Sequence, residues 1–88
     1  MDDKKFIDSI NNLHVLSQDY RNEPLVGLIQ IWKHADKIVL TWEECKDGNQ
    51  RNEYLYTRDV HMKFEDTNEL FEYLKDNGLS VENFDFAR

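Results

Sequence analysis

The sequence predicts an α+β fold: a helix, a three-stranded antiparallel meander and a second helix form a two-layer sandwich, and a short C-terminal segment packs back. Three observations lead to this prediction. Apolar residues recur at helical spacing near both ends of the chain, runs rich in β-branched and aromatic residues fill the middle, and the connections between these runs are short. Neighbouring strands with short connections usually pair in sequence order, so we expect both helices on one face of the sheet.

The first helix is predicted over residues 3–17. Its apolar side chains recur with the period of an α-helix, and Asp2 and Asp3 suit a helix N-terminus, where negative charge is favoured. The apolar line contains Phe6, Ile10, Leu13 and Tyr20. The segment 19–24 is predicted to be a polar connector, because Pro24 disfavours helical conformation at the residue before it.

Two strands are predicted over residues 25–32 and 37–42, with residues 33–36 as the hairpin loop. Both runs are apolar on both faces, which indicates either cover on two sides or one exposed apolar face. Gly27 inside the first run predicts a bulge or a close contact of the backbone. If the loop has an odd length, one face collects Leu28, Trp32, Ile38, Leu40 and Trp42.

The third strand is predicted to begin near Arg51, after a turn at Asp47-Gly48. Between Tyr54 and Phe64 the even positions are apolar except for Arg58, and most odd positions are polar, which is the period of a strand with one buried face. The polar pair Arg58-Asp59 is expected to bend this strand or to split it in two.

The second helix is predicted to begin after Asp66, which can cap it, and Glu69 three residues later completes an Asp version of the capping box. Asn77-Gly78 is a stop signal, and a contact between Leu74 and Leu79 is expected to close the helix end.

The chain is predicted to be a single domain over residues 1–88, with an ordered core over about residues 4–86. The segment 80–86 is expected to pack back on this core, because it carries three apolar residues, too many for a free tail. These are Val81, Phe84 and Phe86.

Acidic residues outnumber basic ones by 18 to 11, which gives a net charge of −7. This balance argues against direct nucleic-acid binding and against binding to an anionic membrane, since both need a basic footprint. No apolar run approaches the ~20 residues of a membrane span. The single cysteine, Cys45, excludes an intrachain disulfide and fits a reducing compartment, so we expect a cytoplasmic protein.

No motif indicates catalysis, and we expect no enzyme activity, no catalytic residues, no cofactor and no metal ion. Cys45 follows Glu43 and Glu44, whose negative charges disfavour a reactive thiolate. The sequence contains no Cys-x-x-Cys pair and no glycine-rich phosphate loop. The three histidines are expected on different elements; they are His14, His34 and His61.

The C-terminal third carries most of the charge, with eight acidic and three basic residues over 59–88. An acidic surface is predicted there, and it comprises Glu65, Glu69, Glu72, Asp76, Glu82 and Asp85. One interpretation is a solvated, solubilising face. The function that we predict is a non-enzymatic protein-binding module, of the inhibitor or immunity type. It would dock its acidic C-terminal helix on a basic or nucleic-acid-binding protein by nucleic-acid mimicry.

The order helix, three strands, helix is also that of double-stranded-RNA-binding domains, which dock the start of the last helix on phosphates with a lysine cluster. Here that helix begins with Asp66 and Glu69 and has no lysine before Lys75. This resemblance is therefore limited to topology and implies no RNA binding. In size, charge and element order the chain is similar in type to small acidic inhibitors, including nucleic-acid-mimicking anti-CRISPR proteins.

Four aromatic residues are candidates for either the core or an exposed interface: Trp32, Trp42, Tyr54 and Tyr56. An exposed interface would support an alternative function, a homodimeric structural or adaptor domain that uses the apolar sheet face. With helices on one side only, Ile29, Ile31 or Val39 would need cover from a second subunit. The sequence leaves both a monomer and a homodimer open.

Overall fold

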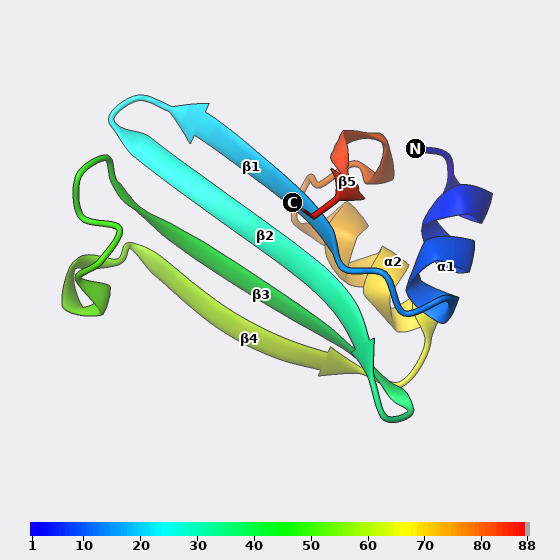
Figure 1. Ribbon diagram of the computed structural model, residues 1–88. Helices are drawn as coiled ribbons and strands as arrows, with labels where there is room; N and C mark the ends of the chain where they lie inside the picture. The colour runs from blue at the N-terminus through cyan, green and yellow to red at the C-terminus, as the bar shows by residue number, and fades with distance from the viewer. Residues whose placement is uncertain (88) are drawn as a thin grey trace.

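The structure is a computed structural model that describes residues 1–87. It is an α+β fold whose antiparallel sheet has the strand order β4-β3-β2-β1-β5 (Figure 1). The elements are α1 (Asp3–Asn11), β1 (Leu16–Asn22), β2 (Leu25–His34), β3 (Lys37–Lys46), η1 (Glu53–Leu55), β4 (Arg58–Phe64), α2 (Thr67–Asp76), η2 (Val81–Asn83) and β5 (Asp85–Phe86). The predicted helix, meander and helix are confirmed, but the sheet has five strands instead of three.

The strand β1 was not predicted, and it is the largest difference from the expected fold. The predicted helix over 3–17 ends at Asn11, and Leu13 has a positive φ of 66° that turns the chain out of the helix. The polar segment that follows is a strand, not a connector, and it pairs with β2 along its whole length. Tyr20, which was grouped with the apolar line of the first helix although it falls in the predicted connector, lies on β1.

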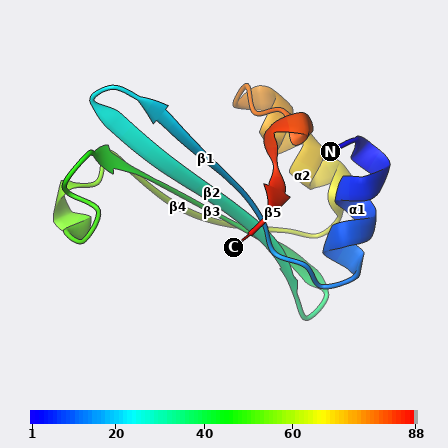
Figure 2. The same ribbon diagram turned by 45° about the horizontal axis from the view of Figure 1, so that its top comes forward.

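The two helices and η2 lie on one face of the sheet, which we call the inner face, and they cover one end of it (Figure 2). The other end of the meander extends beyond them. Twelve buried side chains form the core between the layers: Phe6, Ile10, Leu16, Ile29, Ile31, Ile38, Leu40, Trp42, Phe64, Leu70, Leu74 and Phe84.

The hairpin between β2 and β3 sets which side chains face the helices. Its loop has two residues, Ala35 and Asp36, and the strands pair from His34 and Lys37 onward. An odd loop would have placed these side chains of β2 and β3 on one face. The even loop places them on opposite faces, because a shift of one residue moves every side chain of one strand to the other face. Ile38, Leu40 and Trp42 point to the inner face, whereas Leu28 and Trp32 point to the opposite, outer face.

The third predicted strand begins later than predicted, at the position where a bend or split was expected, and the residues before it are not a strand. Residues 47–57 form a loop that contains η1, and β4 begins at Arg58. Gly48 has φ of 103°, a left-handed conformation that suits glycine. The backbone N–H of Thr57 donates to the Glu44 carbonyl at 2.8 Å and holds the loop end against β3.

The second helix has the ends that the sequence predicts. The Asp66 side chain accepts from the Glu69 N–H at 3.0 Å, and the Glu69 carboxylate accepts from the Glu65 N–H at 2.7 Å. At the other end the Leu79 N–H donates to the Leu74 carbonyl at 2.8 Å, which is the long bond of a Schellman motif.

The C-terminal segment packs back on the core, as predicted. Phe84 is 2 % exposed, and its ring meets the edge of the Phe6 ring with 5.6 Å between centroids. Beyond it, β5 pairs with the first two residues of β1. No helix within residues 1–87 is long and apolar enough to cross a membrane.

Candidate functional site

Three of the six predicted acidic residues lie on the solvent side of α2. Glu69, Glu72 and Asp76 are exposed, and they point away from Leu70 and Leu74, which the helix buries against the core. Their spacing of three and four residues places them along one side of the helix. We call these three residues the acidic side of α2. Glu69 also caps the helix, so it contributes to folding as well as to the charge of this side.

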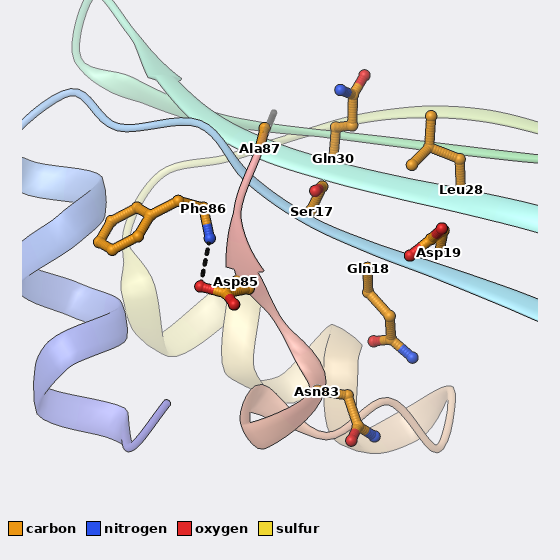
Figure 3. Close-up of a pocket in the computed structure, with 9 residues that line it drawn as sticks. All are labelled: Ser17, Gln18, Asp19, Leu28, Gln30, Asn83, Asp85, Phe86 and Ala87. Carbon is orange, nitrogen blue, oxygen red and sulfur yellow. Dashed lines mark hydrogen bonds between the residues drawn. The ribbon is translucent and has the colours of Figure 1, made fainter.

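The other three acidic residues lie on different elements. Glu65 precedes α2 and pairs with Lys37. Glu82 lies in η2, where its carbonyl accepts from the N-terminal amino group at 3.2 Å. Asp85 begins β5, accepts from the Phe86 N–H at 2.8 Å, and lines a cavity of about 500 Å³ beside β1 (Figure 3). All three are exposed, but the six residues do not share one element.

The four predicted aromatic residues do not form one cluster. Trp42 points to the inner face and is 6 % exposed, whereas Trp32 is half-buried on the outer face. Tyr54 is 99 % exposed on η1, and Tyr56 is partly buried, with its hydroxyl donating to the Gln50 carbonyl. Of the four, only Trp42 belongs to the core.

The outer face of the sheet carries an apolar band, although no helix covers this face in residues 1–87 (Figure 2). Ile29 and Ile31, which were expected to need cover, point inward and are fully buried. Val39 does point outward, where Trp32 is its cross-strand partner. The outer apolar band comprises Val26, Leu28, Trp32, Val39 and Cys45.

The inner face also carries a polar cluster that the sequence did not predict. The Tyr20 ring lies over Gly27, where a Cβ atom would overlap it, and so it crosses β2 to reach β3. There its hydroxyl donates to the Glu44 carboxylate and accepts from the Trp42 indole N–H at 3.0 Å. The Thr57 hydroxyl donates to the same carboxylate at 2.8 Å. Gly27 predicted a close contact of the backbone, but not the residue that makes it.

Hydrogen bonding sets the ionisation of this cluster. The bonds from Tyr20 and then Thr57 lower the pKa of Glu44, because they stabilise its charged form. Burial and the bond to Glu44 raise the pKa of Tyr20. The Arg58 guanidinium stacks on the Trp42 ring at 4.0 Å from its centroid and favours the Glu44 carboxylate electrostatically. The cluster thus ties β1, β3 and the start of β4 together.

The substitution Glu44→Gln is expected to reduce the free energy of unfolding near neutral pH by about 1 kcal/mol, because it removes a charged acceptor of two hydrogen bonds. Since the folded-state pKa of Glu44 is lowered, its contribution is present above the unfolded-state pKa and is lost as pH falls through the folded-state pKa. Urea unfolding of both proteins across the acidic range should show the difference shrinking as pH falls. A constant difference would contradict this assignment.

Metal ligands do not gather in the described part of the chain: residues 1–87 contain no group of three or more His, Cys, Asp or Glu side chains placed to hold a metal ion. His14 packs on the edge of the Phe86 ring at 5.0 Å between centroids. His34 ends β2 and His61 lies on β4.

Comparison of the chain with protein-family models, with curated proteins and with solved structures found no match in any of the three.

Proposed function

We propose that this chain is a non-enzymatic protein-binding module that docks the acidic side of α2 on a basic surface of a partner protein. The observation that carries the proposal is the position of Glu72 and Asp76. Both are exposed, and neither has an ion-pair partner within residues 1–87. Carboxylates with no partner in their own chain keep their charge available to another molecule.

The placement of these charges is unfavourable for the helix itself. Asp76 ends α2, where the helix dipole is negative, and it lies four residues after Glu72, so the two like charges repel. Lys75 is the only basic residue of the last turn. A charge pattern that costs helix stability is consistent with selection for binding, because binding sites often reduce stability.

The partner class follows from charge. A net charge of −7 attracts basic proteins over long distances and accelerates their association at low salt. A groove that binds nucleic acid presents such a basic surface, so a carboxylate row seated in it would act as an inhibitor by mimicking phosphates. The buried free thiol of Cys45 is compatible with a reducing compartment, and we include a cytoplasmic location in the proposal.

The test is reversal of charge at Glu72 and Asp76, since Glu69 is needed to cap the helix. The variant Glu72→Lys/Asp76→Lys should keep its fold and lose at least roughly tenfold in affinity for the protein that the wild type captures at low salt. That protein should be basic and should be released by salt. The matched control is Glu53→Lys/Asp59→Lys, which changes the net charge equally at exposed positions outside α2. Equal capture by both variants would refute the proposal.

The outer apolar band favours a second candidate, a homodimeric structural domain whose two sheets meet face to face. Leu28 is 38 % exposed and Trp32 is half-buried there, on a face that no helix of residues 1–87 covers. Tryptophan is enriched at the centres of protein interfaces. A dimer that is lost in the variant Trp32→Glu would support this candidate, because the substitution places a charge within the outer apolar band.

A further inference from the structure

The edge of β1 is open over most of its length. β5 pairs with Leu16 and Ser17 only, and no other strand of residues 1–87 lies beside residues 18–22 on that side (Figure 1). The Val15 carbonyl accepts from the Ala87 N–H at 2.9 Å, so the backbone groups of Val15 point to this edge. Because backbone groups alternate along a strand, the N–H and C=O of Asp19 and Arg21 point to the edge as well. Unpaired groups of this kind are a template for another strand.

We propose that a second copy of this chain binds along this edge, by antiparallel pairing of the two β1 strands around a two-fold axis at Tyr20. This register places Asp19 opposite Arg21 of the partner subunit, and by symmetry Arg21 opposite the partner's Asp19. Both residues are exposed, and opposite charges directly across a strand pair are favourable. The edge is thus complementary to itself, as a two-fold interface requires.

The backbone fits the same register. The residues that face each other with opposite charge are also those whose N–H and C=O groups point to the edge. Each facing pair of Asp19 and Arg21 can therefore exchange two backbone hydrogen bonds, as in a closely spaced antiparallel pair. Tyr20 forms the intervening pair, and its own backbone groups remain bonded to β2. The two sheets then continue into one another.

An independent observation concerns Gln18. Its side-chain oxygen is buried and has no hydrogen-bond donor among residues 1–87. Figure 3 shows Gln18 beside the cavity at this edge, on the side of the sheet opposite Leu28 and Gln30. The proposed register places Asn22 of the partner subunit directly opposite Gln18, in a pair whose side chains approach closely. The amide of Asn22, an exposed residue, supplies a donor of the kind that this oxygen lacks.

The open part of the β1 edge also has the length that the proposed register needs. The partner strand would end opposite Gln18, because β1 ends at Asn22 and the chain then turns into β2. β5 begins opposite Ser17, the next position. The other sheet edge, β4, carries a similar pair of charges at Asp59 and Lys63, but the described residues leave no buried side-chain acceptor without a partner there. The proposal therefore concerns β1, and it does not depend on the acidic side of α2.

The test is the oligomeric state by light scattering and sedimentation from about 1 µM to about 500 µM. We expect the wild type to dimerise over this range. Asp19→Arg places like charges opposite each other twice and should raise the dimer dissociation constant roughly tenfold or more. Asp19→Arg/Arg21→Asp exchanges the charges and should recover most of this loss. Asp59→Arg and Trp32→Glu, on the other edge and on the outer face, should leave the constant within about threefold of the wild type.

A second measurement uses the wild type alone, because Arg21→Asp also removes ion pairs with Glu23 and Asp47. Residue-resolved amide exchange should slow at Asp19 and Arg21 as concentration rises, while Ser17 stays slow throughout. A monomer over the whole range, or a dimer with unchanged exchange at Asp19 and Arg21, would overturn the proposal. A dimer lost in Trp32→Glu or Asp59→Arg but kept in Asp19→Arg would overturn it too, and would move the contact to the outer face or to β4.

Discussion

The substitution Phe84→Ala is expected to reduce the free energy of unfolding by about 3–5 kcal/mol, the range found when a buried phenylalanine is truncated in a core. Phe84 is 2 % exposed, and its ring packs on Phe6, which in turn lies 5.8 Å from Phe71 between ring centroids. One side chain of the C-terminal segment thus contacts α1, whose Phe6 reaches α2. A loss of this size is a large fraction of the stability of a small domain, about 5–15 kcal/mol.

Urea unfolding monitored by circular dichroism measures this loss. The matched control is Phe86→Ala, two residues further along the same segment. Phe86 is 41 % exposed, and its ring contacts His14 and Lys5 at the surface, so we expect a loss of about 1 kcal/mol or less. Equal losses in the two variants would contradict the placement of Phe84 in the core.

The second large effect is expected at Gly27. A Cβ atom there would overlap the Tyr20 ring, so Gly27→Ala should displace the ring from the inner face. The displaced hydroxyl would lose its bonds to Glu44 and Trp42, and the ring would lose its contact with β2. The lost bonds and packing together predict a decrease of roughly 2–3 kcal/mol in the free energy of unfolding.

A double-mutant cycle isolates this effect. Tyr20→Ala removes the ring, so adding Gly27→Ala to that variant should be neutral or slightly stabilising, because alanine loses less backbone entropy than glycine on folding. Thermal unfolding of the four proteins gives the coupling free energy. If Gly27→Ala costs as much without the ring as with it, the overlap with Tyr20 is not the cause.

The elements that the sequence predicts well are those with strong local signals. The capping residues of α2 and its stop at Asn77-Gly78 specify the helix without reference to the rest of the chain. β1 has no such signal: of its inward residues, Gln18 is polar and Tyr20 is amphipathic, so the strand resembles a polar connector. Its identity depends on pairing with β2, which is a tertiary interaction.

The candidate surfaces were predictable in part for the same reason. The exposure of Glu72 and Asp76 follows from the helical period of α2. Their position relative to Glu82 and Asp85 depends on how residues 80–86 pack back on the sheet. No local sequence pattern predicts this packing. Trp32 and Trp42 lie on opposite faces because the loop between β2 and β3 has two residues, and one residue more would have placed both on the same face.

The way the C-terminal segment closes on α1 has a kinetic consequence. Strands β1 to β4 pair with their neighbours in sequence, so most of the sheet needs only short loops to close. The contact of Phe84 with Phe6 and the pairing of β5 with β1 join opposite ends of the chain, and such distant contacts carry a larger loop-closure entropy. The meander should therefore form before the ends meet, and the end-to-end contact should be absent from the transition state. Phe84→Ala would then leave the folding rate nearly unchanged, and the loss in the free energy of unfolding would come from faster unfolding.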